Sequence, residues 1–317
     1  SVEAGIALPY AGYNIFAVGT AGLGKRTMIK RLLKQHAKTM PTPNDWVYVN
    51  NFQTPRQPLA LCFPAGQGTK FQNALHQAWQ TILKQLERRF SAETYHNRIE
   101  QIRQETGQEQ QLALVELTKE AEGFDLKLIS RNEQHTFVPV YLKDDVLQEM
   151  SQDDLDALSS KERAEIANHM RYMNKKLERL GLHLGDLEDD ARDQVSDLNR
   201  DIAKQVVMPR IELILNKFQN IQGLEQFLKS YANDIIENVE MILDQDEEDF
   251  SPALFSRIPA RYQANVIVSN TPNSGAPVIF EDFPTHYNLL GHVEQLTQNG
   301  TITTDFTLIR AGALHRA

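Results

Sequence analysis

The sequence predicts an α/β fold of the phosphate-loop type, interrupted by a large, mostly α-helical, coiled-coil-like insertion with a small β element. Three observations lead to this prediction. A glycine-rich turn separates an apolar run from a helical run near the start of the chain. Residues 68–245 show helical periodicity with few prolines, and apolar strand-like segments return after residue 260. We therefore expect one α/β domain in two parts, 1–67 and 251–317, separated by an insertion over 68–250.

The glycine-rich turn reads Gly-Thr-Ala-Gly-Leu-Gly-Lys-Arg-Thr over residues 19–27, which is G-x-x-x-x-G-K followed by arginine. The apolar run before it predicts a strand over Tyr13–Val18, and the run after it predicts a helix to about Lys38. Backbone N–H groups of such a loop, together with the helix N-terminus, form an anion site, and glycine permits the positive φ that the turn needs. The residues predicted to bind a nucleotide are Gly19, Gly22, Gly24, Lys25, Arg26 and Thr27.

Arg26 occupies the place where a phosphate loop normally has the serine or threonine that binds Mg²⁺. Lys25 is expected to reach the β- and γ-phosphates. One residue at a helix start turns a side chain by about 100°, so Thr27 does not simply replace the missing hydroxyl. The sequence therefore predicts binding of ATP or ADP, leaves a role for Mg²⁺ open, and argues against hydrolysis by this chain.

The rest of the first part contains two further strand candidates, Asp45–Val49 and Leu59–Phe63. Pro41 and Pro43 separate them from the first helix. Strands that alternate with helices in this order are typical of a parallel sheet, which we expect here.

The insertion begins with a long amphipathic helix, because apolar residues from Phe71 to Phe90 recur at steps of three and four. A β pair is predicted at Phe124–Ser130 and Thr136–Leu142. Ser151 is a candidate N-cap, as are Ser159 and Ser160 for the helix that follows.

A heptad-like stripe then runs from Ile166 to Ile202. Gly181 and Gly185 are expected to break or bend this helix, and Pro209 to interrupt it. A further helix is predicted over about residues 224–243. Antiparallel helices in an elongated arm explain this pattern most simply, and a compact helical bundle is the alternative.

The second α/β part contains strand candidates at Gln263–Ser269 and Ala276–Phe280. Residues 301–309 alternate with period two, which predicts either a strand or a longer ordered loop.

Composition and charge exclude several classes of function. The net charge of the 317 residues is −9, and residues 141–250 hold 26 acidic and 13 basic residues, a net of −13. Such a region repels nucleic-acid phosphates, so a nucleic-acid partner is disfavoured. The single cysteine forms no intramolecular disulfide, and the nine histidines do not cluster at metal-ligand spacings, so no structural metal is expected. Without a long apolar span we expect no membrane insertion and a cytoplasmic protein.

The end of the chain carries a second block of motifs. Residues 283–291 read Phe-Pro-Thr-His-Tyr-Asn-Leu-Leu-Gly, residues 300–306 read Gly-Thr-Ile-Thr-Thr-Asp-Phe, and residues 311–317 read Ala-Gly-Ala-Leu-His-Arg-Ala. Together with Gly12-Tyr-Asn-Ile-Phe16, the phosphate loop and Val47-Tyr-Val-Asn-Asn-Phe52, this block resembles the Lon-related AAA+ proteases. The resemblance covers nearly all of the chain. It is strongest to the Lon-like branch whose ATPase module carries a long helical insertion.

The resemblance implies an N-terminal part of a cytoplasmic, ring-forming peptidase, hexameric in the full-length protein, that acts on proteins or peptides. In that family the terminal block precedes the Walker B strand, and the Ser-Lys dyad lies downstream, so no catalytic residue is assigned in this chain. The insertion would then select or gate protein substrates. The alternative is a non-catalytic scaffold, for oligomerisation or partner docking, whose phosphate loop is vestigial. A coiled-coil ATPase that acts on DNA is disfavoured by the acidic middle region.

Overall fold

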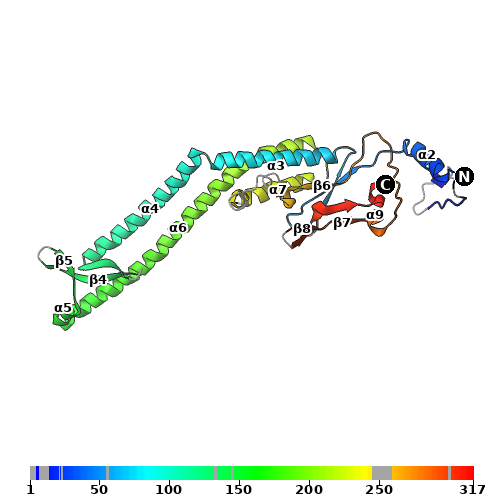
Figure 1. Ribbon diagram of the computed structural model, residues 1–317. Helices are drawn as coiled ribbons and strands as arrows, with labels where there is room; N and C mark the ends of the chain where they lie inside the picture. Colours follow the sequence, from blue (N-terminus) through cyan, green and yellow to red (C-terminus); the bar gives the residue numbers. More distant parts are fainter. Residues whose placement is uncertain are drawn as a thin grey trace. The chain divides into compact units, whose positions relative to one another are not determined.

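The computed structural model describes residues 5–6, 14–20, 22, 24–54, 57–131, 134–143, 146–244, 259–298 and 301–317. The chain divides into two compact units, whose elements are labelled in Figure 1. Unit 1 combines residues 1–87 with residues 202–317, and unit 2 comprises residues 88–201. The insertion was predicted to begin at residue 68, whereas the first stretch of unit 1 continues to residue 87. The predicted end of the insertion, at 250/251, lies outside the described residues.

Unit 1 is built on a three-stranded sheet of order β2-β1-β6, in which both pairings are antiparallel. The expected parallel sheet was wrong, because β1 (Asp45–Val49) and β2 (Leu59–Phe63) are joined by a loop without a crossover helix. β6 (Ala264–Val268) confirms the strand predicted near residues 263–269, and it pairs with β1 across more than 200 residues of sequence. Two segments distant in sequence thus form one sheet.

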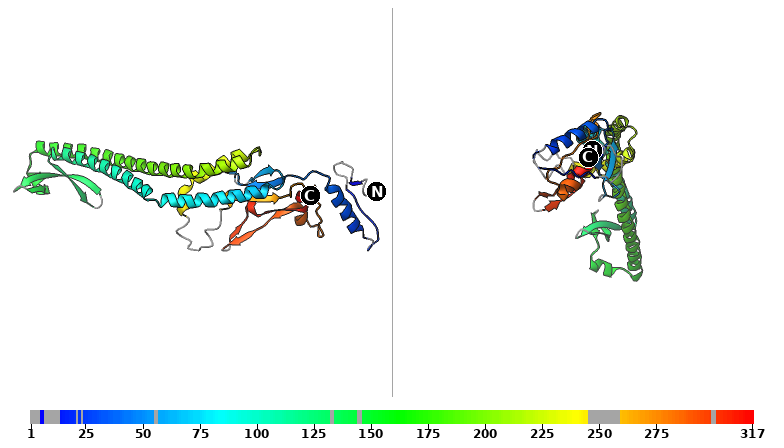
Figure 2. Two further views of the ribbon diagram at one scale, coloured as in Figure 1. Left: turned by 90° about the horizontal axis from the view of Figure 1, so that it is seen from above. Right: turned by 90° about the vertical axis from the view of Figure 1, so that its right-hand side faces the viewer.

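Helices and short elements complete unit 1, and the long helices among them follow the predicted periodicity. They are α2 (Lys25–Ala37), α3 (Gly68–Phe90), the end of α6 (Ser160–Lys217), α7 (Leu224–Glu237), α8 (Val239–Asp244), η1 (Ala260–Tyr262), α9 (His286–Leu290), β7 (Gly291–Val293), β8 (Leu296–Gln298), β9 (Thr301–Thr303), η2 (Phe306–Leu308), β10 (Ile309–Ala311) and α10 (Ala313–Arg316). Two further views show α3 running from the sheet of unit 1 (Figure 2).

The core of unit 1 is aromatic. The ring of Phe63 on β2 stacks on Phe71 of α3, with centroids 4.8 Å apart, and both meet Phe218 just after α6. Trp79 stacks on Tyr262 at 4.4 Å. Aromatic pairs at these separations add to the hydrophobic effect of burying the rings. The stripe predicted from Phe71 to Phe90 is therefore confirmed as the face of α3 that enters this core.

A buried carboxylate joins three segments of unit 1. Asp45 is fully buried; its Oδ2 accepts from the N–H of Gly68 at 2.8 Å and its Oδ1 from the N–H of Asn270 at 2.7 Å. Gly68 opens α3, so the carboxylate also faces the positive end of that helix. The beginning of β1, the beginning of α3 and the chain after β6 are held at one point.

Two predicted strands are absent from the described chain. Residues 14–18 are extended and exposed, with Phe16 at 90%, and Tyr13 lies outside the described residues. Residues 276–280 also form no strand. Apolar alternation gives a segment β propensity, but a strand requires a backbone partner, and neither segment pairs with the sheet. Residues 301–309 contain β9, η2 and the first residue of β10. The segment is therefore neither the single strand nor the ordered loop that was predicted.

Unit 2 contains two long helices and a small sheet. Its elements are α4 (Glu93–Glu122), β3 (Leu126–Arg131), β4 (Gln134–Lys143), β5 (Val146–Glu149), α5 (Gln152–Ala157) and the first part of α6. The predicted β pair is confirmed, and the structure adds β5 as a third strand, in the order β3-β4-β5. Within this unit α4 and α6 run side by side in opposite directions, since Tyr95 bonds Asn199 at 3.0 Å while Glu120 pairs with Lys176.

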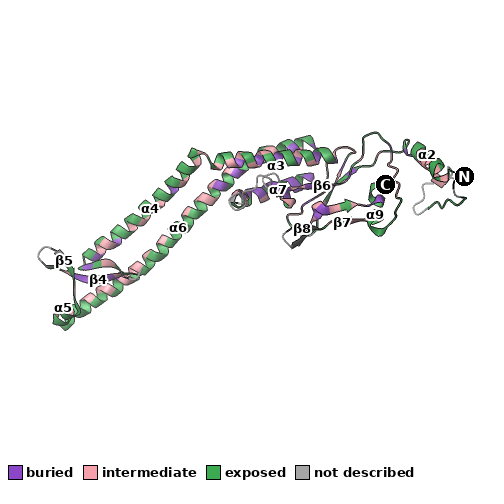
Figure 3. Ribbon diagram, viewed as in Figure 1, coloured by how far each residue is buried: buried purple, intermediate pink, exposed green. Residues whose placement is uncertain are grey.

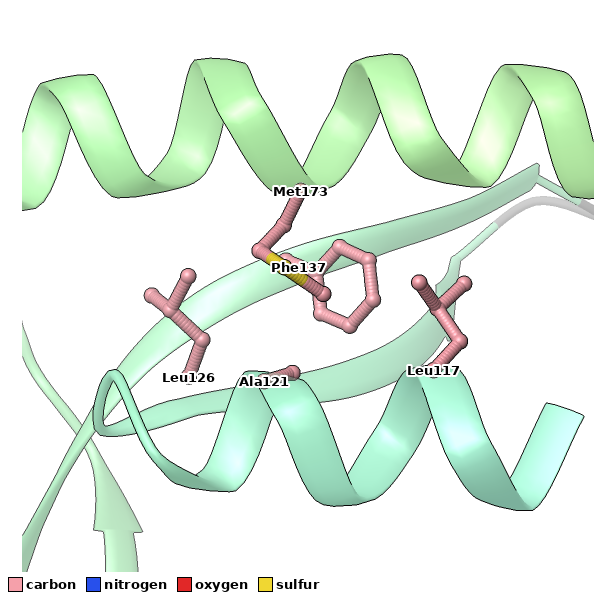
Figure 4. Packing of buried hydrophobic residues seen from close by; sticks show 5 residues of the cluster. All are labelled: Leu117, Ala121, Leu126, Phe137 and Met173. Atoms are coloured by element: carbon pink, nitrogen blue, oxygen red, sulfur yellow. The ribbon is translucent and has the colours of Figure 1, made fainter.

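The core of unit 2 lies where its sheet meets both helices. Leu117 and Ala121 of α4, Leu126 of β3, Phe137 of β4 and Met173 of α6 are buried together (Figure 4). Figure 3 shows this buried patch against the largely exposed remainder of the two helices. A single compact cluster thus anchors the strands to the helices.

Local signals at the helix ends behaved as predicted, whereas helix interruptions did not. Ser151 caps α5 in a reciprocal capping box with Asp154, and Ser159, rather than Ser160, caps α6 through Glu162. The expected interruption at Pro209 was wrong, because α6 continues to Lys217. The same helix also passes through Gly181 and Gly185 unbroken. The helix predicted over 224–243 divides at Asn238 into α7 and α8.

Candidate phosphate-binding site

The backbone of the predicted phosphate loop takes up the conformation that glycine allows. Gly22 and Gly24 have φ values of 85° and 67°, in the left-handed region. Gly24 is the N-cap of α2, and its carbonyl accepts the first helical hydrogen bond from the N–H of Met28 at 2.9 Å. The loop therefore leads directly into a helix N-terminus, where unpaired N–H groups face outward.

Charge on α2 favours an anion at this end. The helix has 13 residues, Lys-Arg-Thr-Met-Ile-Lys-Arg-Leu-Leu-Lys-Gln-His-Ala, with no acidic residue among them. The positive end of the helix dipole and the Lys25 ammonium in its first turn act in the same direction. These groups fit a phosphate.

Lys25 folds back over the loop. Its Nζ donates to the carbonyl oxygen of Gly19, so the first and last residues of the G-x-x-x-x-G-K motif are in contact. A side chain at Gly19 would press on the stem of Lys25, since an added Cβ would lie 3.2 Å from Cδ. The ammonium thus lies within the turn, where a phosphate oxygen would compete with the Gly19 carbonyl for its protons.

Arg26 is engaged by a segment that is distant in sequence. Its guanidinium pairs with the carboxylate of Asp282, and both side chains are more than half exposed. Arginine has no oxygen with which to bind a metal ion, and this one is already engaged with a carboxylate. Thr27 is exposed on α2. The loop residues therefore fit a phosphate group but do not supply the usual hydroxyl for Mg²⁺.

The segment that carries Asp282 follows α2 in the opposite direction. Near the end of the helix, the N–H of Ala276 donates to the carbonyl of Ala37 at 2.9 Å. In the middle, Nζ of Lys30 lies 4.2 Å from the ring centroid of Phe280. At the start of the helix lies the Arg26–Asp282 pair. The site is thus built from both stretches of unit 1.

Gly275 makes this close approach feasible. It has a φ of 79°, and an added Cβ would collide with the carbonyl oxygen of Ala37. Sequence reasoning missed both Gly275 and Asp282. The unusual cation at Arg26 was the one signal for a carboxylate partner, but nothing local indicated which carboxylate it was.

The terminal motif block forms a small folded element of its own. Thr285 caps α9 by accepting from the N–H of Asn288 at 3.2 Å. β7 pairs with β10, and Gly291 and Gly312 lie where any side chain would collide with a neighbouring backbone. These contacts explain the glycines of the motif through packing.

An ion pair joins β10 to the residue that follows β7. Arg310 on β10 donates to Glu294 at 2.8 Å, and this hydrogen bond lowers the pKa of the Glu294 carboxyl and raises that of the Arg310 guanidinium. Asn265 of β6 donates to the carbonyls of Phe306 and Ile309 at 2.8 and 2.9 Å. The terminal block is therefore attached to the sheet that contains β1.

Comparison with known families identifies two stretches of the chain. Residues 45–78 match the model of a Lon-like LonC helical domain, and residues 274–317 match the model of a LonB-like AAA domain. No curated protein matches the chain. Both matches support a Lon-like AAA+ protease family for this chain. This confirms the resemblance seen in the sequence.

Both matches of this Lon-like chain lie in unit 1. The helical-domain match covers β1, β2 and the first part of α3, and the AAA match runs from Ser274 through α10. The phosphate loop lies outside both matched stretches. Among the described helices, none has the length and apolar character needed to cross a membrane.

Proposed function

We propose that this chain is the ATPase-module and substrate-handling region of a Lon-like serine peptidase that acts on proteins. In this proposal the parent enzyme is cytoplasmic, forms a homo-oligomeric ring and cleaves with a Ser-Lys dyad that is not assigned in this chain. The phosphate loop binds ATP or ADP but does not hydrolyse it. The helical insertion handles the polypeptide substrate.

One observation carries the proposal more than any other. β1 begins the first Lon-like stretch, and β6 ends six residues before the second, yet the two strands are neighbours in one sheet. The intervening helices therefore interrupt a domain rather than separate two. This is the organisation expected of an ATPase module that carries an insertion.

The nucleotide part of the proposal rests on the loop geometry. Two left-handed glycines lead into the N-terminus of α2, and the Lys25 ammonium reaches back to the Gly19 carbonyl at the start of the loop, an arrangement that suits a phosphate. Arg26 supplies no metal ligand and is paired with Asp282. Phosphoryl transfer requires a positioned metal ion, so we expect binding without turnover.

Titration calorimetry of the chain with ATP and ADP, each with Mg²⁺ and with a chelator, tests this part. We expect binding that is unchanged by the chelator and that falls at least roughly tenfold in Lys25→Ala, since one charge-assisted hydrogen bond is lost. Lys34→Ala is the matched control, because Lys34 lies exposed near the other end of α2. Equal losses in the two variants would show that general positive charge, not the loop, attracts the nucleotide.

A scaffold without nucleotide binding is the second candidate, and one feature favours it. Both cations of the loop are engaged by the protein itself, Lys25 by the Gly19 carbonyl and Arg26 by Asp282. If neither ATP nor ADP binds the wild-type chain, the loop is a structural turn and the scaffold is the better account.

A further inference from the structure

The two edges of the sheet in unit 1 differ in the elements that lie beside them. Beyond β6 lie β10 and η2, which are held to it by the Asn265 side chain through hydrogen bonds to the carbonyls of Phe306 and Ile309. At the other edge the sheet ends with β2, and no strand in the described part of the chain pairs with its outer side. Among the described residues, β10 and η2 border β6, whereas no strand borders the outer side of β2.

The open edge carries little of the usual protection within the strand itself. Edge strands commonly carry a charge, a proline or a bulge that prevents pairing with another chain. β2 reads Leu-Ala-Leu-Cys-Phe, and the prolines nearest to it, Pro58 and Pro64, stand just outside its two ends. It pairs with β1 in regular register along its full length. Its outer side is therefore competent to accept a further strand.

A cavity of about 440 Å³ follows this edge. Leu59 and Leu61 from one face of β2 and Ala60 and Cys62 from the other all line it, so it wraps around the strand rather than lying on one face of the sheet. The opposite wall is formed by the beginning of α7, including Gln226. The cavity has room for side chains of a strand added at β2.

The chemistry of the walls indicates what fits. Thirteen described residues line the cavity and none of them is charged. Gln226 offers both a donor and an acceptor, which suits backbone amides of any sequence, and Asn51 offers its amide donors, since its Oδ1 already accepts from the N–H groups of Gln53 and Thr54. Trp46, 44% exposed, and Phe227 supply apolar surface. A charged side chain would lose its hydration here without a partner, so a neutral segment is favoured.

We propose that β2 binds an extended, uncharged segment of an unfolded polypeptide as an added strand, with alternate side chains in this cavity. The inference rests on the proposed function, because it names the place at which a substrate-handling chain would hold its polypeptide. A second copy of the chain fits less well. Self-pairing through β2 would bring two such cavities face to face, and a strand as short as β2 fills neither.

The test uses the full chain and a fluorescein-labelled peptide of twelve residues that alternates valine and threonine. We expect saturable binding by anisotropy and slowed amide hydrogen exchange within residues 59–63 when the peptide is bound. A peptide of the same sequence with alternate N-methylated residues, which removes the donors along one edge, should bind at least roughly tenfold more weakly.

Two substitutions of the same kind separate the cavity from general effects of charge. Gln226→Glu places a carboxylate in the cavity wall and should weaken peptide binding roughly tenfold. Gln77→Glu makes the same change on the exposed side of α3, outside the cavity, and should leave peptide binding unaltered. Thermal unfolding of both variants checks that the fold is retained.

Several outcomes would overturn the inference. These are no binding by the wild-type chain, binding without protection of residues 59–63, equal effects of the two glutamate substitutions, or equal affinity for the N-methylated peptide. Protection that rises with chain concentration in the absence of peptide would assign the edge to a second copy. The peptide assay contains no nucleotide, so the Lys25→Ala variant should bind peptide normally. Absence of peptide binding would therefore leave the nucleotide proposal standing, and absence of nucleotide binding would leave the peptide proposal standing.

Discussion

Asp45 shows how one residue can fix the topology of unit 1. Its carboxylate accepts two backbone N–H groups, one from Gly68 and one from Asn270, and it is fully buried. Thr69 Oγ1 also lies 3.2 Å from Ser269 Oγ, so a second polar contact joins the beginning of α3 to the chain after β6, but this one is exposed. We therefore expect its loss to weaken the whole unit rather than one strand.

Asp45→Ala should destabilise unit 1 by about 2 to 4 kcal/mol, because two N–H groups lose a charged acceptor in a buried site. Urea unfolding followed by tryptophan fluorescence measures this, since both tryptophans, Trp46 and Trp79, belong to unit 1. Asp282→Ala is the control: it removes an exposed ion pair and should cost less than about 1 kcal/mol. A change for Asp45→Ala no larger than the control would contradict the assigned role.

A second residue-scale prediction concerns pH and unit 2. Hydrogen bonds from Lys176 and then from Tyr172 lower the pKa of Glu120 below 4.5. Because the pKa of Glu120 is lower in the folded state, the stabilisation from its hydrogen bonds is fully present above the unfolded pKa. That stabilisation is lost as the pH falls through the folded pKa. The helix transition of unit 2, followed by circular dichroism in urea, should therefore weaken on acidification below about pH 4.5.

Glu120→Gln should remove this part of the pH dependence. Glu122→Gln, on the same helix and exposed, should retain it. If both variants keep the acid sensitivity of the wild type, the sensitivity comes from other carboxylates and the pair with Lys176 contributes nothing measurable.

At the scale of elements, the strands of unit 2 depend on one buried ring. Phe137 of β4 is fully buried between α4 and α6 (Figure 4). Phe137→Ala should cost about 3 to 5 kcal/mol, through lost burial and the cavity left behind. Leu112→Ala removes an apolar side chain from the same unit that is 63% exposed, and should change stability by less than about 0.5 kcal/mol. Circular dichroism in urea compares the two, and similar losses would contradict the assigned core.

The continuity of α6 through Pro209 gives another prediction at this scale. A proline inside a helix lacks one N–H and crowds the preceding turn, which costs about 3 kcal/mol. The helix persists because Val206, Val207 and Ile211 around it are buried in unit 1. Pro209→Ala should therefore stabilise unit 1 by about 1 to 3 kcal/mol in the tryptophan-detected transition. A loss of stability would show that the proline is required for the local path of the helix.

The elements that were predicted correctly are those specified by nearby residues. The α3 stripe, the β pair of unit 2, and the caps at Ser151 and Ser159 depend on residues only a few positions apart. β1, β2 and β6 were also recognisable as short apolar runs, and more and less buried positions alternate along β1 and β2.

The features that could not be predicted depend on distant partners. Residues 14–18 and 276–280 have strand-like composition, but pairing decides whether they form strands, and composition carries no information about pairing. The antiparallel sense of the sheet follows from the loop between β1 and β2. At the site, the glycines and Lys25 could be predicted from the motif, whereas the partner of Arg26 lies 256 residues away.

At the scale of the whole molecule, the central claim is that the Lon-like module is one folded unit interrupted once. β1 and β6, more than 200 residues apart, share a register, and unit 2 closes a core of its own between Leu117 and Met173. Unit 2 therefore interrupts unit 1 without contributing a strand to the sheet of order β2-β1-β6.

Limited proteolysis under native conditions, followed by gel filtration and mass mapping, tests this claim most directly. We predict that the resistant species contains residues 45–63 and 264–268 together, co-eluting even after cuts between residues 88 and 201. A stable species that retains residues 45–63 and has lost residues 264–268 would contradict the single interrupted unit.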